Sequence, residues 1–213
     1  MWHLVLNLLV LWMVSVLRLL QVIAMMRAAS SFRLASAARR PGTVRCFVGT
    51  TPDENLARFL AEHDLASLPP APPPAGLYRT AARDGRWLVV SGHAPYEIDG
   101  SKIVGKIADE SDAELERGRR AARHTALAVL ATLQKELGSL DRVERVLKTL
   151  GMVNCGPDFG KHPAVIDGYS EVMRAVFGDD RGVGVRSAVG VGSLPGDITT
   201  ECEGVFVVRD DAN

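Results

Sequence analysis

Two charged residues near the carboxyl end of the chain, Arg186 and Glu201, could act together on a small polar molecule. An arginine presents a planar fork of N–H donors that can hold a carboxylate through two parallel hydrogen bonds. A glutamate beside a cation in a partly dry cleft can orient a water molecule or remove its proton. Such a pair could bind a carboxylate-bearing molecule and activate water for its hydrolysis. The alternative is a cross-strand ion pair of small structural value.

Two predicted strands carry this pair. Residues 185–191 hold Arg186 and residues 199–208 hold Glu201, and we expect the two strands to adjoin. Because side chains alternate along a strand with a period of two, Glu203 should lie on the same side as Glu201. It is therefore a second candidate carboxylate.

The elements that position these strands follow from local patterns. An Asp-Gly pair predicts a hairpin turn over 83–86, and Ser111 with Glu114 has the spacing of a capping box, so a helix should begin there. Gly138 lies where that helix should end. In chain order we predict first a helix over 52–63 and an extended proline connector over 69–74. Strands follow over 76–82 and 87–92, with a short third strand near 103–107. We then predict a helix over 111–137, a strand over 142–154 and a helix that starts near Pro163 and ends at Gly178.

The order ββ(β)αβαββ predicts an α+β sandwich, with a mixed sheet and two helices on one of its faces. Such an arrangement leaves the other face of the sheet without cover. Burial of that face against copies of the same chain would cover it, so we expect a homo-oligomer.

The first fifty residues differ from the rest, because every charged side chain before Asp53 is an arginine. Residues 4–26 are almost continuously apolar and long enough to cross a bilayer, although Arg18 interrupts them. The Arg-, Ser- and Ala-rich stretch that follows has the composition of a transit peptide. We predict a mitochondrial or other organellar address with translation starting at Met25 or Met26. The alternatives are a membrane anchor formed by residues 4–26 and a cytoplasmic protein.

The predicted organisation is a targeting or anchor segment over 1–50, a short helix and connector over 51–75, the main domain over 76–209 and a tail over 210–213. The whole chain balances 25 basic against 25 acidic residues, so its charge does not favour a phosphate backbone. Three widely spaced cysteines indicate neither a zinc site nor a disulfide framework. The basic run on the long helix is expected to be a solvated face, with RNA contact as the alternative; it consists of Arg117, Arg119, Arg120 and Arg123.

The segment VRSAVGVGSLPGDITTECE, residues 185–203, resembles the carboxyl-terminal signature of the YjgF/RidA family. Tyr78, Ser91-Gly92 and the stretch 159–169 add to the resemblance, which runs from about Gly76 to Val208. It implies a chorismate-mutase-like fold of the Bacillus type and a homotrimer with clefts between subunits. It also implies hydrolysis of enamines and imines, of the 2-iminobutanoate and 2-iminopropanoate type, to 2-oxo acids and ammonia. Some relatives are labelled endoribonuclease L-PSP.

The resemblance assigns Arg186 and Glu201 to catalysis and a further set of residues to substrate binding. Besides Arg186, that set is Tyr78, Ser91, Gly92, Ser187 and Ala188. It implies no metal and no cofactor, and a small carboxylate-bearing imine or 2-oxo acid as ligand. Ala188 stands where many members have cysteine, and the family's asparagine is not evident near Asp167. Two other functions stay open: a carboxylate-binding trimer without turnover, and a ribonuclease or translation inhibitor.

Overall fold

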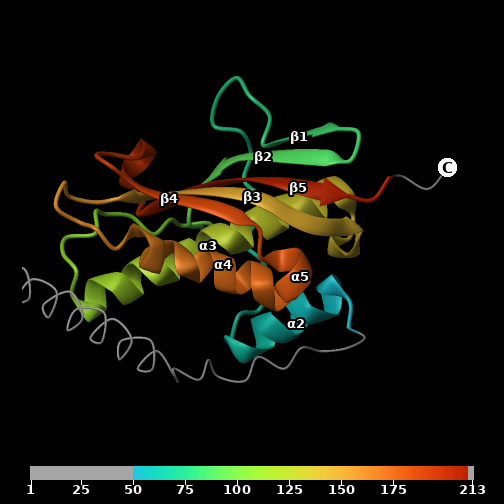
Figure 1. Cartoon of the computed structure of the whole chain (residues 1–213), viewed down its shortest axis with the longest axis horizontal. Helices are drawn as coiled ribbons and strands as arrows, with labels where there is room; N and C mark the ends of the chain where they lie inside the picture. Colours follow the sequence, from blue (N-terminus) through green and yellow to red (C-terminus); the bar gives the residue numbers. More distant parts are fainter. Residues whose placement is uncertain (1–49, 211–213) are drawn as a thin grey trace, which may run out of the picture. The chain divides into compact units, whose positions relative to one another are not determined.

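A five-stranded mixed sheet forms the centre of the described part of this chain, residues 50–210 of a computed structural model (Figure 1). The strand order is β1-β2-β5-β3-β4, and only β3 and β4 run parallel. The strands are β1 (Ala81–Asp84), β2 (Trp87–His93), β3 (Val143–Asn154), β4 (Val185–Val191) and β5 (Thr200–Val208).

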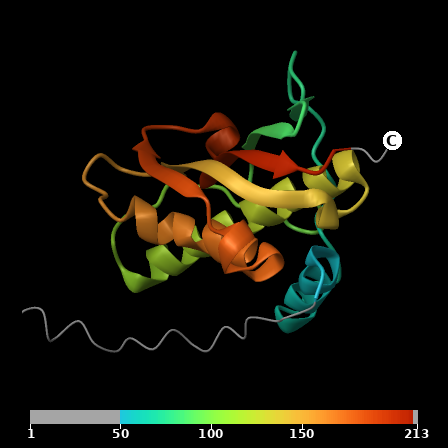
Figure 2. The same ribbon diagram turned by 45° about the vertical axis from the view of Figure 1, so that its right-hand side comes forward.

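Helices cover one face of this sheet. The long α3 (Asp112–Leu137) and α4 (His162–Phe177) pack against each other and against the sheet, and Figures 1 and 2 both show them on the same side. The predicted α+β sandwich with two helices on one face is therefore confirmed. Two shorter helices complete the layer, α2 (Pro52–Glu62), which packs on α4, and α5 (Asp179–Gly182).

The long helix begins and ends where the sequence predicts. The Ser111 side chain accepts a hydrogen bond from the backbone N–H of Glu114, and Gly138 ends the helix in the left-handed conformation with φ of 77°. The predicted capping box is only half formed. The Glu114 carboxylate accepts from the backbone N–H of Ala108 and binds Arg117 instead of returning to the Ser111 backbone.

Two strand predictions before α3 need correction. The first strand begins at Ala81 rather than at Gly76, so Tyr78 lies in a bend before it and not on a strand. Residues 103–107 make isolated bridges to two different partners, Val104 to Ile198 and Ile107 to Cys155, and therefore form no strand. The hairpin itself is confirmed, with Gly85 at φ of 54° in its turn.

The strands that carry Arg186 and Glu201 do not adjoin, contrary to the prediction. Strand β3 lies between β4 and β5 and pairs with both. A direct pairing of β4 with β5 would have required only the short loop between them, but β3 offers each of them a long buried partner.

The predicted targeting or anchor segment lies outside the described residues, apart from Thr50. In the part of the chain from Thr50 to Asp210, no helix is long and apolar enough to cross a membrane.

Candidate functional site

Arg186 lies on the edge strand β4 and reaches over the first two turns of α4. Its Nη1 donates to Asp167 Oδ1 at 2.9 Å and to Ser170 Oγ at 2.9 Å, and its Nη2 donates to the Pro163 carbonyl at 3.3 Å. The arginine side chain is 22% exposed and that of Asp167 is 48% exposed. The guanidinium is thus held in place on the helix side of the sheet while one flank stays open to solvent.

Glu201 lies on the opposite face of the sheet, beside the Ser91-Gly92 strand end. A Cβ added to Gly92 would stand only 1.9 Å from Glu201 Oε1, so the carboxyl group occupies the space that any other residue at position 92 would fill. Partial burial raises the pKa of the Glu201 carboxyl, and the nearby Glu203 carboxylate raises it further. Such a group exchanges protons more readily near neutral pH than an ordinary glutamate does.

One chain does not bring Arg186 and Glu201 together. Along β5 the buried Cys202 faces the helices, so its neighbours Glu201 and Glu203 face away from them. Arg186 contacts residues of α4 and therefore belongs to the helix side. Because the two groups lie on opposite faces and on strands separated by β3, the same-chain ion pair that was the structural alternative does not form.

The other predicted binding residues are divided between the two faces. Ser187 is exposed on the open face, whereas Ala188 packs against the core on the helix side. The Oγ of Ser91 is buried without a hydrogen-bond partner among the described residues. Tyr78 is 46% exposed, and its hydroxyl accepts a hydrogen bond from the backbone N–H of Ala75.

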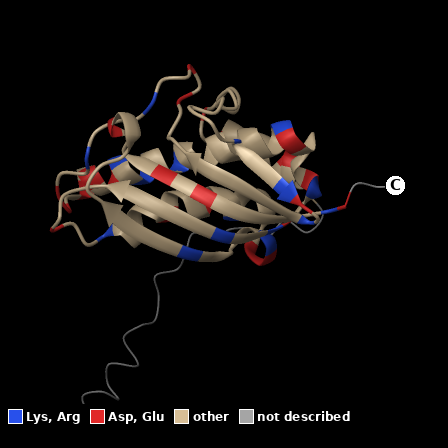
Figure 3. Cartoon of the chain, turned by 90° about the horizontal axis from the view of Figure 1, so that it is seen from above, with Lys and Arg blue, Asp and Glu red and all other residues tan. Residues whose placement is uncertain are grey.

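Figure 3 shows two acidic bands on one strand of the sheet, with basic bands on neighbouring strands. The two acidic residues of β5 are Glu201 and Glu203. Trp87 and Val89 of β2 are 58% and 49% exposed, and Val185 and Val189 of β4 are exposed as well. Exposed apolar side chains grouped in this way on one face of a sheet are typical of surfaces that bind another molecule. The face that the sequence analysis expected to need cover is bare in the single chain.

Protein TCP17 of Trypanosoma cruzi is 38% identical to this chain over 128 residues, which make up 60% of this chain and 79% of that protein. The chain belongs to the same family as Protein TCP17. No protein-family model matches the sequence.

Solved structures with the same fold confirm the resemblance recognised from the sequence. A protein of unknown function from Agrobacterium tumefaciens, Atu1372, has a TM-score of 0.64 and 29% identity, and the match covers 74% of this chain and 96% of that one. A protein proposed to be an endoribonuclease from Shewanella oneidensis has a TM-score of 0.66 and 24% identity, covering 75% and 100%. The matched structures also include YjgF of Escherichia coli and a RidA from Psychrobacter. This TCP17 relative thus shares the fold of Atu1372 and of the Shewanella protein.

Sequence reasoning missed the partners of Arg186 in this TCP17 relative. Pro163, Asp167 and Ser170 follow one another at intervals of four and three, so they share one side of the predicted second helix. The sequence shows this spacing, but the spacing does not indicate which strand packs over that side of the helix. A second missed contact joins Cys155 Sγ and His162 Nε2 at 3.4 Å, although burial raises the pKa of this thiol.

His93 is the last residue of β2 and follows Gly92. Its Nδ1 lies 2.7 Å from the Ser91 carbonyl and its Nε2 lies 2.7 Å from Thr132 Oγ1. Burial lowers the pKa of this imidazole, which the Ser91 carbonyl partly offsets. The buried ring therefore links the sheet to α3.

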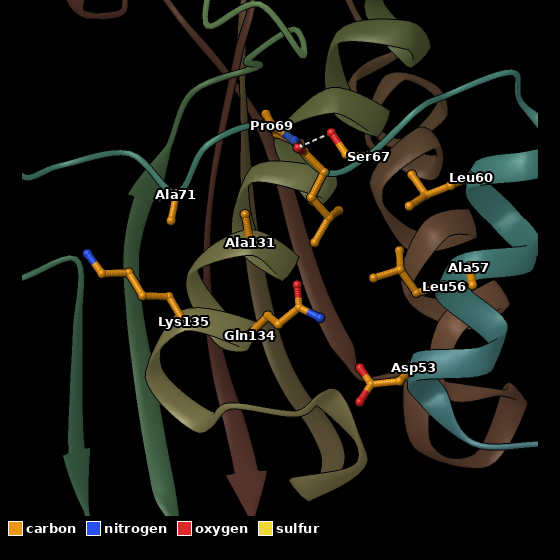
Figure 4. A pocket seen from close by; sticks show the side chains of 11 residues that line it. Asp53, Leu56, Ala57, Leu60, Ser67, Pro69, Ala71, Ala131, Gln134 and Lys135 are labelled. Carbon is orange, nitrogen blue, oxygen red and sulfur yellow. Dashed lines mark hydrogen bonds between the residues drawn. The ribbon is translucent and has the colours of Figure 1, made fainter.

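A groove of about 580 Å³ lies between α2, the proline connector and the end of α3 (Figure 4). Leu56 and Leu60 of α2 face Ala131 of α3 across it, and Leu68 and Pro69 form another wall. None of the predicted site residues lines this groove, so it is separate from the site of Arg186 and from that of Glu201.

The basic run on α3 is neutralised by acidic partners. Each of its arginines forms an ion pair with a glutamate, which leaves no row of unpaired cations for a nucleic-acid backbone. The pairs are Arg117 with Glu114, Arg119 with Glu171, Arg120 with Glu97 and Arg123 with Glu116.

Proposed function

We propose that this TCP17 relative hydrolyses small imines to carbonyl compounds and ammonia, with Glu201 as the group that handles water. The Glu201 carboxylate accepts a proton from water while the water oxygen bonds to the carbon of the protonated imine and the C=N π electrons move to nitrogen. Glu201 then passes this proton to the nitrogen of the resulting carbinolamine. The carbinol O–H gives its proton to the Glu201 carboxylate, which later loses it to solvent, while the C–N bond breaks, a C=O bond forms and ammonia leaves. The proposed substrates are 2-iminobutanoate and 2-iminopropanoate, which yield 2-oxo acids.

The observation that carries this proposal is the position of Glu201. Its carboxyl group is partly buried over Gly92 and has a raised pKa. A general base works best when its pKa approaches the working pH. A glutamate with a purely structural role would be stabilised by a nearby cation, yet none of the described residues forms an ion pair with Glu201.

The proposed cleft spans two copies of the chain. Arg186 would bind the substrate carboxylate from the edge strand of one copy, and Glu201 would act from the open face of the next. The exposed apolar side chains of that face, among them Trp87 and Val89, support burial against a neighbouring copy. We propose a homotrimer, in agreement with the resemblance.

The direct test measures ammonia release from 2-iminobutanoate generated in situ by the full chain. Two variants keep the shape of the site: Glu201→Gln removes the base, and Arg186→Gln removes the cation but retains a donor toward Asp167. Each should lower kcat/KM by at least about a hundredfold. Wild-type rates in both variants would refute the mechanism.

Mixing the two inactive variants tests whether the site spans copies. If Arg186 and Glu201 act from different chains, random reassembly after unfolding restores about a quarter of the sites, because one copy can supply the arginine and its neighbour the glutamate. If both act from one chain, every site lacks one group and no activity returns. Each variant refolded alone is the control.

The two alternative functions predict other outcomes in the same experiments. A carboxylate-binding trimer without turnover would bind 2-oxobutanoate in calorimetry but release no ammonia. A ribonuclease would cleave RNA in a salt-dependent way. The ion pairs of the α3 arginines speak against an RNA-binding face.

A further inference from the structure

The guanidinium of Arg186 already holds a carboxylate from its own chain. Asp167 Oδ1 and Ser170 Oγ both accept from Nη1 at 2.9 Å, and the Pro163 carbonyl accepts from Nη2. An arginine has five N–H donors. Two of them have no partner among residues 50–210, which is enough for one bidentate carboxylate. Arg186 is therefore oriented for a ligand, although it is also neutralised.

The ion pair of Arg186 and Asp167 determines the charge of this site. Arg186 and Asp167 together carry no net charge, and the aspartate side chain is 48% exposed, so a ligand on the guanidinium lies close to it. A ligand with only a carboxylate would meet the Asp167 carboxylate on the same guanidinium. A ligand that also carries a protonated nitrogen next to its carboxylate would bring a cation to the aspartate. The second oxygen, Oδ2, accepts no hydrogen bond from any described residue and is free to bind that nitrogen.

We propose that Asp167 is a second ligand-binding group of the Arg186 site, which binds the protonated nitrogen of a zwitterionic ligand and disfavours a plain carboxylate. This proposal rests on the imine hydrolysis proposed above and adds a preference of the site for the substrate over the product. A protonated 2-imino acid has both charges, whereas the 2-oxo acid product has only the carboxylate. The pair therefore favours binding of the substrate and release of the product.

The test compares two ligands of the same carbon skeleton on the full chain by calorimetry. 2-Aminobutanoate carries the protonated nitrogen, and 2-oxobutanoate lacks it. The wild type should bind 2-aminobutanoate about tenfold more tightly or better, since a charge within a few ångströms changes an equilibrium by a factor of ten or more. Asp167→Asn keeps the size of the side chain and an acceptor for Nη1, but it should abolish or reverse this preference.

Ser170→Ala provides the matched control. It removes the other acceptor on the same Nη1 nitrogen without altering any charge, so the ratio of the two affinities should stay at the wild-type value. If Asp167→Asn leaves the ratio unchanged, or if Ser170→Ala changes it equally, the proposal is overturned and the Asp167 contact only ties β4 to α4.

The two proposals fail in different ways. In one case the wild type releases no ammonia, but Asp167→Asn loses the preference for 2-aminobutanoate. This result would overturn the proposed hydrolysis and support the binding role of Asp167. In the other case turnover depends on Arg186 and Glu201, while Asp167→Asn leaves the ratio of the two affinities unchanged. That result would support the proposed hydrolysis and overturn the binding role of Asp167. As a kinetic readout, Asp167→Asn should show stronger inhibition by 2-oxobutanoate.

Discussion

Substitution of Gly92 by alanine should displace the Glu201 carboxyl group without disturbing the fold. The new Cβ would stand 1.9 Å from Glu201 Oε1 and 2.8 Å from its Cδ, whereas ordinary contact begins near 3.4 Å. The oxygen must therefore retreat by about 1.5 Å. Because the atoms in the way are the end of a flexible side chain, rotation can relieve the clash, and we expect a stability change below about 1 kcal/mol.

The effect on activity should be much larger than the effect on stability. A misplacement of about 1 Å in a catalytic group can lower a rate about a hundredfold. We therefore expect Gly92→Ala to lower kcat/KM for 2-iminobutanoate about a hundredfold, measured as ammonia release. Gly156→Ala is the matched control, because a Cβ at that position meets no atom within 4 Å.

A Gly92→Ala protein that is folded and keeps the wild-type kcat/KM would refute the role of Glu201, since its carboxyl group would then not need this position. If the variant unfolds, Glu201→Gln answers the same question without a steric clash. A hundredfold loss in Gly156→Ala as well would show that the assay responds to any glycine-to-alanine change and not to the position of Glu201.

Three further changes test the electrostatics and the packing around the site. Glu203→Gln should lower the pKa of Glu201 and move the acidic limb of the pH–rate profile to lower pH; an unmoved limb would mean that another group titrates. The pKa of Glu201 is higher in the folded than in the unfolded state, so the free energy of unfolding falls as pH rises through the folded-state pKa. Removal of the Glu203 charge reduces this loss. Urea unfolding should therefore show Glu203→Gln to be more stable than the wild type at neutral pH but not in acid. Gly168→Ala would place a Cβ 2.2 Å from the Arg119 carbonyl, where backbone and not a side chain blocks it, and should cost about 2 kcal/mol and lower Tm by roughly 4–8 °C. Gly138→Ala forces a left-handed φ of 77° on a residue with a Cβ, and denaturant unfolding should show a loss of about 1 kcal/mol, with Gly138→Asn losing less.

Elements whose signals are local could be predicted from the sequence. The long helix has its cap at Ser111 and its stop at Gly138, and strand β4 coincides with the predicted Val185–Val191. These features depend on neighbours a few residues away, so a linear pattern contains them. The period of two along β5 likewise placed Glu201 and Glu203 on one side of the sheet.

The start of the first strand was less predictable. Residues 76–80 have the composition of a strand, but beyond the Ala81–Val90 pair they make only one hydrogen bond to β2, from the Ser91 N–H to the Thr80 carbonyl. The segment 103–107 reads as a strand and makes only single bridges. A strand exists only where a partner supplies a continuous ladder, and that partner is chosen by the whole fold.

Within this protein, the sequence by itself determined which residues could do chemistry, the α+β class and the resemblance to the YjgF/RidA family. Only the tertiary structure decided that β3 separates Arg186 from Glu201, that they face opposite sides, and that Asp167 holds the arginine. The physical reason is that alternation fixes sides within one strand, whereas the order of strands and the helix that crosses above them depend on long-range packing. A pair that reads as one site in the sequence is thus divided, in the folded chain, between the two faces of its sheet.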